Sequence, residues 1–560
     1  MQKIKIATTV DNAGFGWILE TIGIATLLLN KKKKATIEIY LLDGAPVFLR
    51  NKILGALRKI YVKIPLIYEA IFFFLNFFIR NKKKLNLLYE NYKEDSIENN
   101  ILINKRVNLN IEKNIIEIKK FELNTSFADF IKALFKTLFI WLTIILSKDA
   151  YIKFLNYKDN NISIGDLAGS AFLKIYPQYG GNLKINFKLF RIFLKCMYLN
   201  QISKNIQKKQ IKSFFFTNPE PTYVETFWKR KFLHLNSKII ETNSYDGKLK
   251  IVDRKNKYFN PWILPKPIHK MSPKIKRTID NYFKKRFYHP HKVLEYLRKN
   301  GTNNNKKKIL KNIKKKNINI LKNKSYAVIY LHAFEDAQYC FGINGFKDMY
   351  EWTHFTIEKC LESQNFQKIL IKPHPTINHD YKADKIAFEK LLKIYSNSKN
   401  VEFLEPKTSI FSLTKHNEFF HFVHHGSVAI ELAYLDERII GSIGGPWSNN
   451  YKFIKTWHSK SSYSKLIKDC KKGDELNKYL KSKEHLYSYV LKAHINSLSI
   501  KKRSIRHIIM NKYPQFKHEI TGSKKFGLEL KKMTYDSKLL KEILNLIFAK
   551  YNQNNKIYKN

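Results

Sequence analysis

Residues 419–442 of this 560-residue chain read FFHFVHHGSVAIELAYLDERIIGS, and their pattern indicates the fold class. The apolar run Phe419–Val423 predicts a buried strand, and the polar corner after it predicts a turn. Ser427–Leu435 has the apolar spacing of a helix, and Arg438–Ser442 predicts the next strand. Strand, helix and strand in this order are typical of a parallel sheet with helices on its faces.

The same alternation extends upstream to about residue 325. Further strands are predicted at Tyr326–His332, Lys368–Lys372 and Val401–Leu404, and helices at Met349–Glu362, Tyr381–Tyr395 and Ser409–His416. We therefore predict a Rossmann-like domain over residues 325–460. The remainder, residues 461–560, is predicted to be a helical, basic tail.

The N-terminal part repeats this pattern less regularly. A strand at Ile4–Val10, an apolar helix at Trp17–Leu29 and a strand at Thr36–Leu42 predict a β-α-β start. Aromatic-rich helices predict an insertion at about residues 50–160, and strands near Ser213 and Lys238–Glu241 resume the alternation. We expect residues 1–300 to form a second Rossmann-like domain that faces the other across a cleft. Residues 301–324, rich in Asn and Lys, are the predicted linker.

The charge balance is strongly basic. Lys and Arg number 102 against 46 Asp and Glu, a net charge of +56, so polyanions should be attracted. Lys, Asn and Ile are abundant along the whole chain, which favours solvated surface, with an anionic membrane surface as the next alternative. The predicted linker lacks the aromatic residues that stack on bases, so no specific nucleic acid is expected.

The cysteines and the N-terminus point to the cytoplasm. Four cysteines are scattered without a metal-binding or paired spacing, at Cys196, Cys340, Cys360 and Cys470. The first ten residues are typical of a strand rather than of a secretion signal.

Two apolar stretches resemble membrane segments. Ile64–Ile79 is interrupted by polar residues, and the apolar run Thr137–Leu146 has about half of the roughly 20 residues that spanning requires. Lys132 and Lys136 precede the second run at helical spacing. This pattern fits a buried helix, which we favour, or a helix in a membrane interface.

Lys372-Pro-His374-Pro forms the first polar corner after a predicted strand. In a parallel sheet, ligands bind at the carboxyl ends of the strands. A cation and an imidazole at this edge are suited to phosphate groups. The alternative is a turn stiffened by proline with exposed side chains.

The second corner is His425-Gly426-Ser427. Gly426 allows a ligand to approach the backbone, and Ser427 can cap the following helix, whose N–H groups attract phosphate. Glu431 lies one helical turn later on the same face, where it can accept hydrogen bonds from ribose hydroxyls. An ordinary helix cap is the alternative.

Two further loops follow strands of the same domain. The glycine-rich loop after residue 441 includes Trp447, which can stack on a base or a sugar ring. His332 and Asp336 follow the first strand of the domain and are candidate sugar contacts. Ordinary turns explain these loops nearly as well.

The combination of Lys372-Pro-His-Pro with His425-Gly-Ser-Val-Ala-Ile-Glu resembles glycosyltransferases of capsule and surface polysaccharide biosynthesis. It is also similar to corners of sialyltransferase-like, Kdo-transferase-like and glycerophosphotransferase enzymes. The resemblance covers residues 325–450 and implies a GT-B fold, with a nucleotide-sugar donor in the C-terminal lobe and a glycan or lipid-linked acceptor in the N-terminal lobe. It assigns donor binding to Lys372, His374, Ser427 and Glu431. The chain departs from the group at Leu435-Asp-Glu-Arg438, where a glycine-containing turn is usual.

Asp11, after the first strand, is the predicted catalytic base, with Glu225 and Asp246 as reserves. A helix-capping aspartate is the alternative for Asp11. No Asp-x-Asp pair follows a predicted strand, so we expect neither a required metal nor another cofactor. A nucleotide-sugar epimerase of the same fold and a basic protein that binds nucleic acid or lipid surfaces are the competing functions.

Overall fold

The computed structural model describes residues 2–10, 35–43, 107–111, 114–120, 127–204, 213–216, 224, 226–235, 238–242, 249–252, 267–268, 270–288, 324–335, 338–339, 342, 344–378, 382–406, 408–414, 419–443, 445, 451–471 and 483–491. The predicted helix Trp17–Leu29, the apolar stretch Ile64–Ile79 and nearly all of the predicted linker lie outside these residues.

Seven strands form the first sheet, in the order β3-β4-β2-β1-β7-β8-β9. They are β1 (Gln2–Val10), β2 (Ala35–Asp43), β3 (Val107–Ile111), β4 (Asn114–Lys120), β7 (Ser213–Phe216), β8 (Lys238–Thr242) and β9 (Leu249–Val252). The edge strands β3 and β9 pair antiparallel, and all other neighbours pair parallel. Counted along the chain, the five parallel strands have the spatial order 3-2-1-4-5, which is that of a Rossmann-like sheet.

The strands β3 and β4 lie within the segment for which a helical insertion was predicted. Val107-Asn-Leu-Asn-Ile111 alternates apolar and polar residues, which is the period of a strand. β4 pairs with β2 from Thr36↔Ile115 to Leu41↔Lys120, so this part of the segment completes the first sheet. Among the described residues of this segment, helix is found from Phe127 onward.

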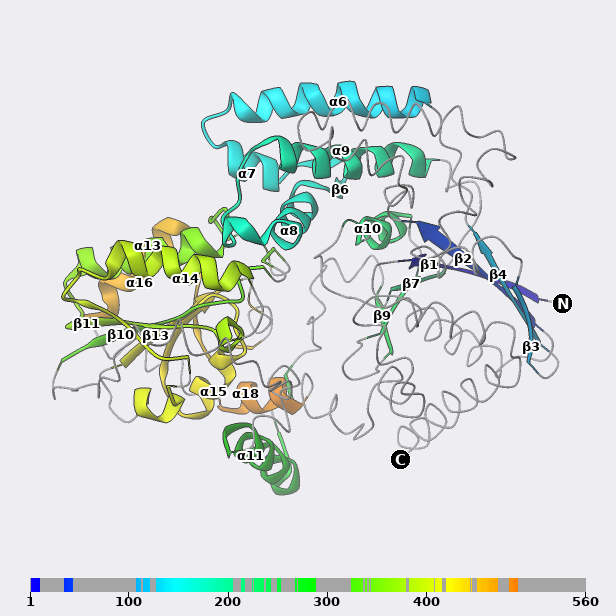
Figure 1. Ribbon diagram of the computed structural model, residues 1–560. Coiled ribbons are helices and arrows are strands. Elements are labelled where there is room, and N and C mark those ends of the chain that lie inside the picture. The colour runs from blue at the N-terminus through cyan, green and yellow to red at the C-terminus, as the bar shows by residue number, and fades with distance from the viewer. Residues whose placement is uncertain are drawn as a thin grey trace.

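A helical layer lies above the two sheets in Figure 1. It consists of α6 (Phe127–Ile145), α7 (Ala150–Leu155), α8 (Gly165–Ile175), α9 (Phe187–Ile202) and α10 (Thr226–His234). Aromatic side chains form its core, and Phe154, Phe172, Phe193 and Trp228 are fully buried there. Within the described part of the chain, no helix has the length and apolar character needed to cross a membrane.

The second sheet has six strands in the order β12-β11-β10-β13-β14-β15. They are β10 (Tyr326–Tyr330), β11 (Lys368–Lys372), β12 (Val401–Phe403), β13 (Phe419–Val423), β14 (Arg438–Ser442) and β15 (Lys455–Trp457). Every pair of neighbouring strands is parallel. If the strands are numbered in the order in which they occur in the chain, their order across the sheet is 3-2-1-4-5-6. Five of these strands were predicted, and β15 was missed. The α/β fold with two Rossmann-like sheets is confirmed.

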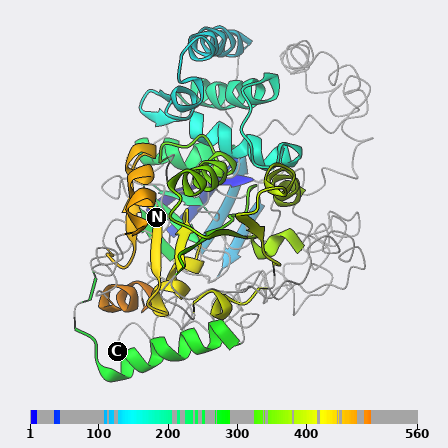
Figure 2. The same cartoon turned by 90° about the vertical axis from the view of Figure 1, so that its left-hand side faces the viewer.

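Helices cover both faces of the second sheet. One face packs against α13 (Met349–Ser363), α14 (Lys382–Tyr395) and α16 (Lys460–Lys468), and the other against α11 (Pro273–Tyr288), α15 (Val428–Tyr434) and α18 (Lys483–Val490). Figures 1 and 2 show α11 below the sheet, on the side away from the helical layer. α11 lies in the range predicted for the N-terminal domain, yet its apolar residues pack on the C-terminal sheet.

The helical layer contacts the second sheet through the start of α13. Asp348 caps this helix, since one carboxylate oxygen accepts from the backbone N–H of Glu351 at 2.7 Å. The other oxygen accepts from the backbone N–H of Leu183 at 2.8 Å. Burial raises the pKa of Asp348 to about 6. Nearby, Gly181 with a φ of 69° leaves no room for a Cβ, which would lie 2.5 Å from Phe334 Cβ.

Candidate functional site at the edge of the second sheet

The strand order of the second sheet reverses between β10 and β13. In an open parallel sheet the loops after these two strands run in opposite directions, which leaves a crevice at their carboxyl ends. β10 pairs with β13 from Tyr326↔Phe419 to Ile329↔Phe422, so both strands end at the same level. The segments that follow β10, β11 and β13 carry the predicted site residues.

Three histidines from three different strand ends meet at this edge. His332 follows β10, His374 follows β11 and His425 follows β13. The ring centre of His332 lies 4.1 Å from that of His425 and 6.3 Å from that of His374. The Nδ1 atom of His332 donates to the backbone carbonyl of Ala333 at 3.0 Å, which makes Nε2 the acceptor of the neutral ring. Sequence reasoning found all three residues, and the structure brings them together.

His424 extends this cluster into the protein. Its Nδ1 atom lies 2.8 Å from Nδ1 of His425, so one ring donates to the other. Its ring packs edge-on against Trp352 and Trp457. Burial lowers the pKa of His424 to about 3 and places that of His425 well below its ordinary value. Both imidazoles are therefore neutral at pH 7. The hydrogen bond with the more deeply placed His424 holds the ring of His425 in position.

Lys372 ends β11, and its side chain reaches the loop that follows the neighbouring strand β12. Its Nζ atom donates to the backbone carbonyl of Pro406 at 2.8 Å. Burial lowers the pKa of this ammonium group to about 8, while the charge of Glu431 opposes the shift. Lys372 is therefore a cation at neutral pH whose ammonium group is largely shielded from solvent. Such a group favours the binding of an anionic ligand.

Ser427 and Glu431 lie on one face of α15, as their spacing predicted. Both are bound by Arg286 of α11, whose Nη2 donates to Ser427 Oγ at 3.0 Å and whose Nε donates to Glu431 Oε1 at 2.5 Å. Arg286 also donates from Nη1 to the hydroxyl of Tyr282 at 3.0 Å. The Arg286 side chain is only 2% exposed. Its planar guanidinium is therefore a buried group that binds Ser427 and Glu431 at the same time.

The predicted helix cap at Ser427 is not formed. Ser427 has helical backbone angles, φ −62° and ψ −13°, and its side chain makes no capping hydrogen bond. A cap residue has an extended backbone, so a residue that is already helical cannot turn its oxygen back toward the free N–H groups. The hydroxyl binds Arg286 instead. α15 has only seven residues, so we assign no phosphate site to its N-terminus.

Arg286 is the residue that sequence reasoning missed. Ile279, Tyr282, Phe283 and Arg286 follow the helical spacing i, i+3, i+4 and i+7, and all four are buried on one face of α11. This pattern marks the buried face of α11. Nothing in the pattern indicates that the face meets α15, about 145 residues later in the chain.

A buried polar chain lies under the site, within the sheet. The hydroxyl of Tyr330 and Nδ1 of His421 are 3.2 Å apart, and Nε2 of His421 lies 3.1 Å from the carboxylate of Glu437. Glu437 belongs to the Leu435–Arg438 turn that departs from the resembled group. Asp436 occupies the left-handed position of this turn with a φ of 61°, where a glycine is usual. Asp436 therefore allows the turn to form without a glycine, and Glu437 is a buried partner of His421.

Five predicted site residues lie outside the described residues: Asp11, the reserve bases Glu225 and Asp246, Asp336 and Trp447. Within the described part of the chain, no group of three or more His, Cys, Asp or Glu side chains is arranged to hold a metal ion. The catalytic base and the metal-independent reaction remain predictions.

No protein-family model and no curated protein matches the sequence. The solved structures that match include a glycosyltransferase from Rickettsia africae ESF-5, at 9% identity over 90% of this chain and 97% of that chain, with a TM-score of 0.25. A UDP-GlcNAc 2-epimerase from Neisseria meningitidis bound to UDP-GlcNAc matches at 10% identity over 89% and 100% of the two chains, with a TM-score of 0.25. The wall teichoic acid polymerase TagF matches at 9% identity over 75% and 100%, with a TM-score of 0.23.

At TM-scores of this size the likeness carries no argument about this chain. The fold rests instead on its own strand order, 3-2-1-4-5 in the first sheet and 3-2-1-4-5-6 in the second. The chain is an α/β protein with two Rossmann-like sheets.

Proposed function

We propose that the chain is a nucleotide-sugar-dependent glycosyltransferase of the GT-B type, with the donor bound at the carboxyl edge of the second sheet. The observation that carries this proposal is the meeting of His332, His374 and His425 at the point where the strand order reverses. Such crevices are the usual ligand sites of doubly wound sheets.

The nucleoside part of the donor is assigned to α15. Arg286 occupies Oε1 of Glu431, so Oε2 is the oxygen that accepts from ribose hydroxyls. Gly426 lies just before this helix. A Cβ built there would make only an ordinary contact with Val428, at 3.7 Å, so packing leaves room for a larger residue. We assign this space to the donor.

The phosphate part is assigned to His374, His425 and Lys372, because the neutral ring of His332 already donates its one N–H to the carbonyl of Ala333. A neutral imidazole can donate one N–H to a phosphate oxygen, and the ammonium group supplies the positive charge that a departing diphosphate requires. Because Lys372 is short of solvent, an anion at this edge would restore a favourable environment for its charge. These groups would stabilise the leaving nucleotide without a metal ion.

The acceptor side is proposed from the sequence. Asp11 is the proposed base that takes the proton of the acceptor hydroxyl, and Asp336 and Trp447 are proposed sugar contacts. The resemblance to capsule and surface-polysaccharide enzymes favours a growing glycan or a lipid-linked acceptor, handled in the cytoplasm at the inner face of the membrane.

Nucleotide release tests the transfer. The full chain is incubated with UDP-, GDP-, CDP- and CMP-sugars, with and without short glycan or lipid-linked acceptors, and the free nucleotide is measured. We expect one donor to release its nucleotide in an acceptor-dependent manner, and His374→Ala to abolish the release. A sugar that is interconverted while still attached to its nucleotide would identify an epimerase instead and would contradict the transferase.

A further inference from the structure

Helix α6 is apolar on two opposite faces. Its inner face packs into the core of the helical layer through Phe130, Ala133, Trp141 and Ile144, which are at most 8% exposed. Its outer face carries Phe135, Phe139 and Leu142, which are 66%, 71% and 57% exposed, and Leu146, which directly follows the helix and bonds to the carbonyl of Leu142, is 84% exposed. The favoured prediction of a buried helix therefore holds for the inner face and is wrong for the outer face.

The four exposed residues form one stripe. Positions 135, 139, 142 and 146 are separated by four, three and four residues, so they follow one line along a helix. The stripe continues at the end of the helix with Ile145, which is 45% exposed. Soluble proteins rarely expose such a contiguous run of large apolar side chains without a partner for it.

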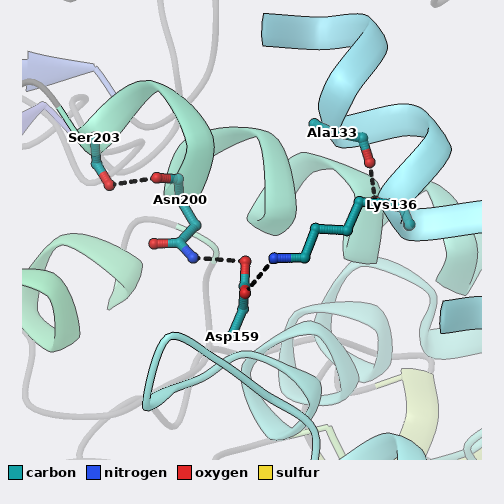
Figure 3. A network of polar contacts seen from close by, with 6 residues as sticks. Ala133, Lys136, Asp159, Asn200 and Ser203 are labelled. Carbon is teal, nitrogen blue, oxygen red and sulfur yellow. Dashed lines mark hydrogen bonds and ion pairs between the residues drawn. The ribbon is translucent and has the colours of Figure 1, made fainter.

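The rotation of α6 is fixed by polar contacts on its inner side, which Figure 3 shows. Nζ of Lys136 donates to Asp159 Oδ1 at 2.5 Å, and the other oxygen of Asp159 accepts from the amide of Asn200 on α9 at 2.8 Å. Asp159 is 7% exposed. Turning the helix to bury its apolar stripe would break this network, so the stripe is presented outward by the fold.

The position of α6 gives the stripe access to an extended surface. Figures 1 and 2, which view the molecule from directions 90° apart, both show α6 at the outer edge of the helical layer. α6 has 19 residues, which would measure about 29 Å along its axis. A flat apolar partner can therefore cover its whole outer face.

The charge of the helical layer indicates the kind of partner. Residues 127–204 contain 11 Lys and Arg against 4 Asp, which leaves +7. Lys132 and Lys148 are exposed near the two ends of the stripe. An apolar stripe between basic side chains is the arrangement of helices that lie in the interface of an anionic membrane.

We propose that the outer face of α6 docks on an anionic membrane surface, with the helix lying along the interface and the stripe Phe135, Phe139, Leu142 and Leu146 inserted among the lipids. Lys132 and Lys148 then face the lipid headgroups. This docking surface is distinct from the donor site and does not depend on the proposed transferase activity.

Vesicle flotation of the full chain tests the proposal. Vesicles of phosphatidylcholine alone are compared with vesicles that also contain about one third phosphatidylglycerol, in low salt and in 0.5 M NaCl. The variant Phe135→Asn/Phe139→Asn/Leu142→Asn removes the stripe, and Phe139→Asp is a milder alternative. The matched control is Ile394→Asn on α14, a position that is 51% exposed.

We expect the wild-type chain and Ile394→Asn to float with anionic vesicles, and the stripe variants to bind at least tenfold more weakly. Part of the wild-type binding should persist in high salt, because salt screens charges but does not weaken apolar insertion. His374→Ala should float like the wild type, which separates this docking from the donor site.

Three results would overturn the proposal. The first is equal flotation of wild type and stripe variants, which would mean adsorption by general positive charge. The second is a lower melting temperature of the stripe variants in solution, since the face would then be covered within the chain. The third is a wild-type dimer that the stripe variants convert to a monomer, which would make a second copy the partner.

Discussion

Arg286 connects the two residues of α15 to which donor binding is assigned. Its guanidinium group binds both the Ser427 hydroxyl and the Glu431 carboxylate. It therefore positions two groups that would contact the donor. A lysine would keep the charge but could not bind both groups with a planar fork. The arginine is therefore a positioning residue whose loss should affect both stability and binding.

We expect Arg286→Ala to lower the free energy of unfolding by about 3–5 kcal/mol, because it leaves the carboxylate of Glu431 without its buried partner. The exposed Arg277 lies on the same helix, and Arg277→Ala should change stability by less than about 0.5 kcal/mol. Urea unfolding measures both. The double variant Arg286→Met/Glu431→Gln should recover part of the loss, and no recovery would mean that the ion pair does not account for it.

Lys372 predicts the pH dependence of donor binding. Its pKa is lowered to about 8 by burial, so the ammonium form disappears as the pH rises above 8. A phosphate ligand prefers the ammonium form, so its affinity should be highest below pH 8 and should fall above it by up to about tenfold per pH unit. Calorimetric titration of the bound nucleotide at pH 7, 8 and 9 measures this effect.

Lys372→Arg is the matched variant, because arginine stays charged over this whole range. Its affinity for the nucleotide should be nearly constant from pH 7 to 9. A wild-type affinity that does not change over the same range would remove Lys372 from the phosphate site.

The polar residues that follow the strands of the second sheet could be identified individually from the sequence. His332, His374 and His425 each follow an apolar run, and strands that end at one edge bring such residues together. The role of Ser427 as a helix cap could not be judged from sequence, because capping depends on backbone angles that a Gly-Ser corner does not fix.

At the scale of elements, apolar periodicity predicted the second sheet almost completely. Its strands are buried on both faces and appear as continuous apolar runs, of which Phe419–Val423 is an example. β15 was missed because Lys455–Trp457 has only three residues and contains a lysine and a threonine. β3 and β4 were missed because the aromatic-rich sequence of that segment favoured helices over its whole length.

The start of α13 provides a test of how the elements are joined. Both oxygens of Asp348 accept backbone N–H groups, one within α13 and one from Leu183 in the helical layer. An asparagine has one acceptor oxygen, so Asp348→Asn leaves one of these buried N–H groups unsatisfied. We expect a loss of about 1–3 kcal/mol in urea unfolding at pH 7.5.

The matched control for this change is Asp149→Asn. Asp149 precedes α7 in the same way but is exposed and makes no capping hydrogen bond through its side chain. Its substitution should leave stability nearly unchanged. Equal effects of the two substitutions would contradict the role given to Asp348.

At the scale of the whole molecule, both sheets have a doubly wound chain order, 3-2-1-4-5 in the first and 3-2-1-4-5-6 in the second. How separate segments pack against each other does not follow from local pattern. α11 is an amphipathic helix in the sequence, but its place on the second sheet depends on side chains such as Tyr434, whose ring stacks on Phe283 at 3.9 Å. The apolar pattern therefore predicted much of the two sheets, whereas the packing of α11 on the second sheet could not be read from it.

A substitution of Gly181 tests the contact between the helical layer and the second sheet. Gly181→Ala would force a Cβ against Phe334, in addition to the strain of its left-handed backbone. Gly342→Ala carries a similar backbone strain, with a φ of 96°, but its Cβ would meet nothing closer than 3.6 Å. Thermal unfolding should show a larger loss for Gly181→Ala. Equal losses would mean that the close contact contributes nothing to stability.

The edge of the second sheet is the proposed binding site for the nucleotide of a sugar donor. Thermal unfolding with CMP, CDP, UDP and GDP tests it most directly, because a ligand at about 100 times its dissociation constant stabilises a protein by about 2.7 kcal/mol. We predict that one nucleotide stabilises the wild-type chain and Gly342→Ala, and that Gly426→Ala, although folded, loses this stabilisation. An absence of stabilisation by every nucleotide, or full stabilisation of Gly426→Ala, would contradict the account.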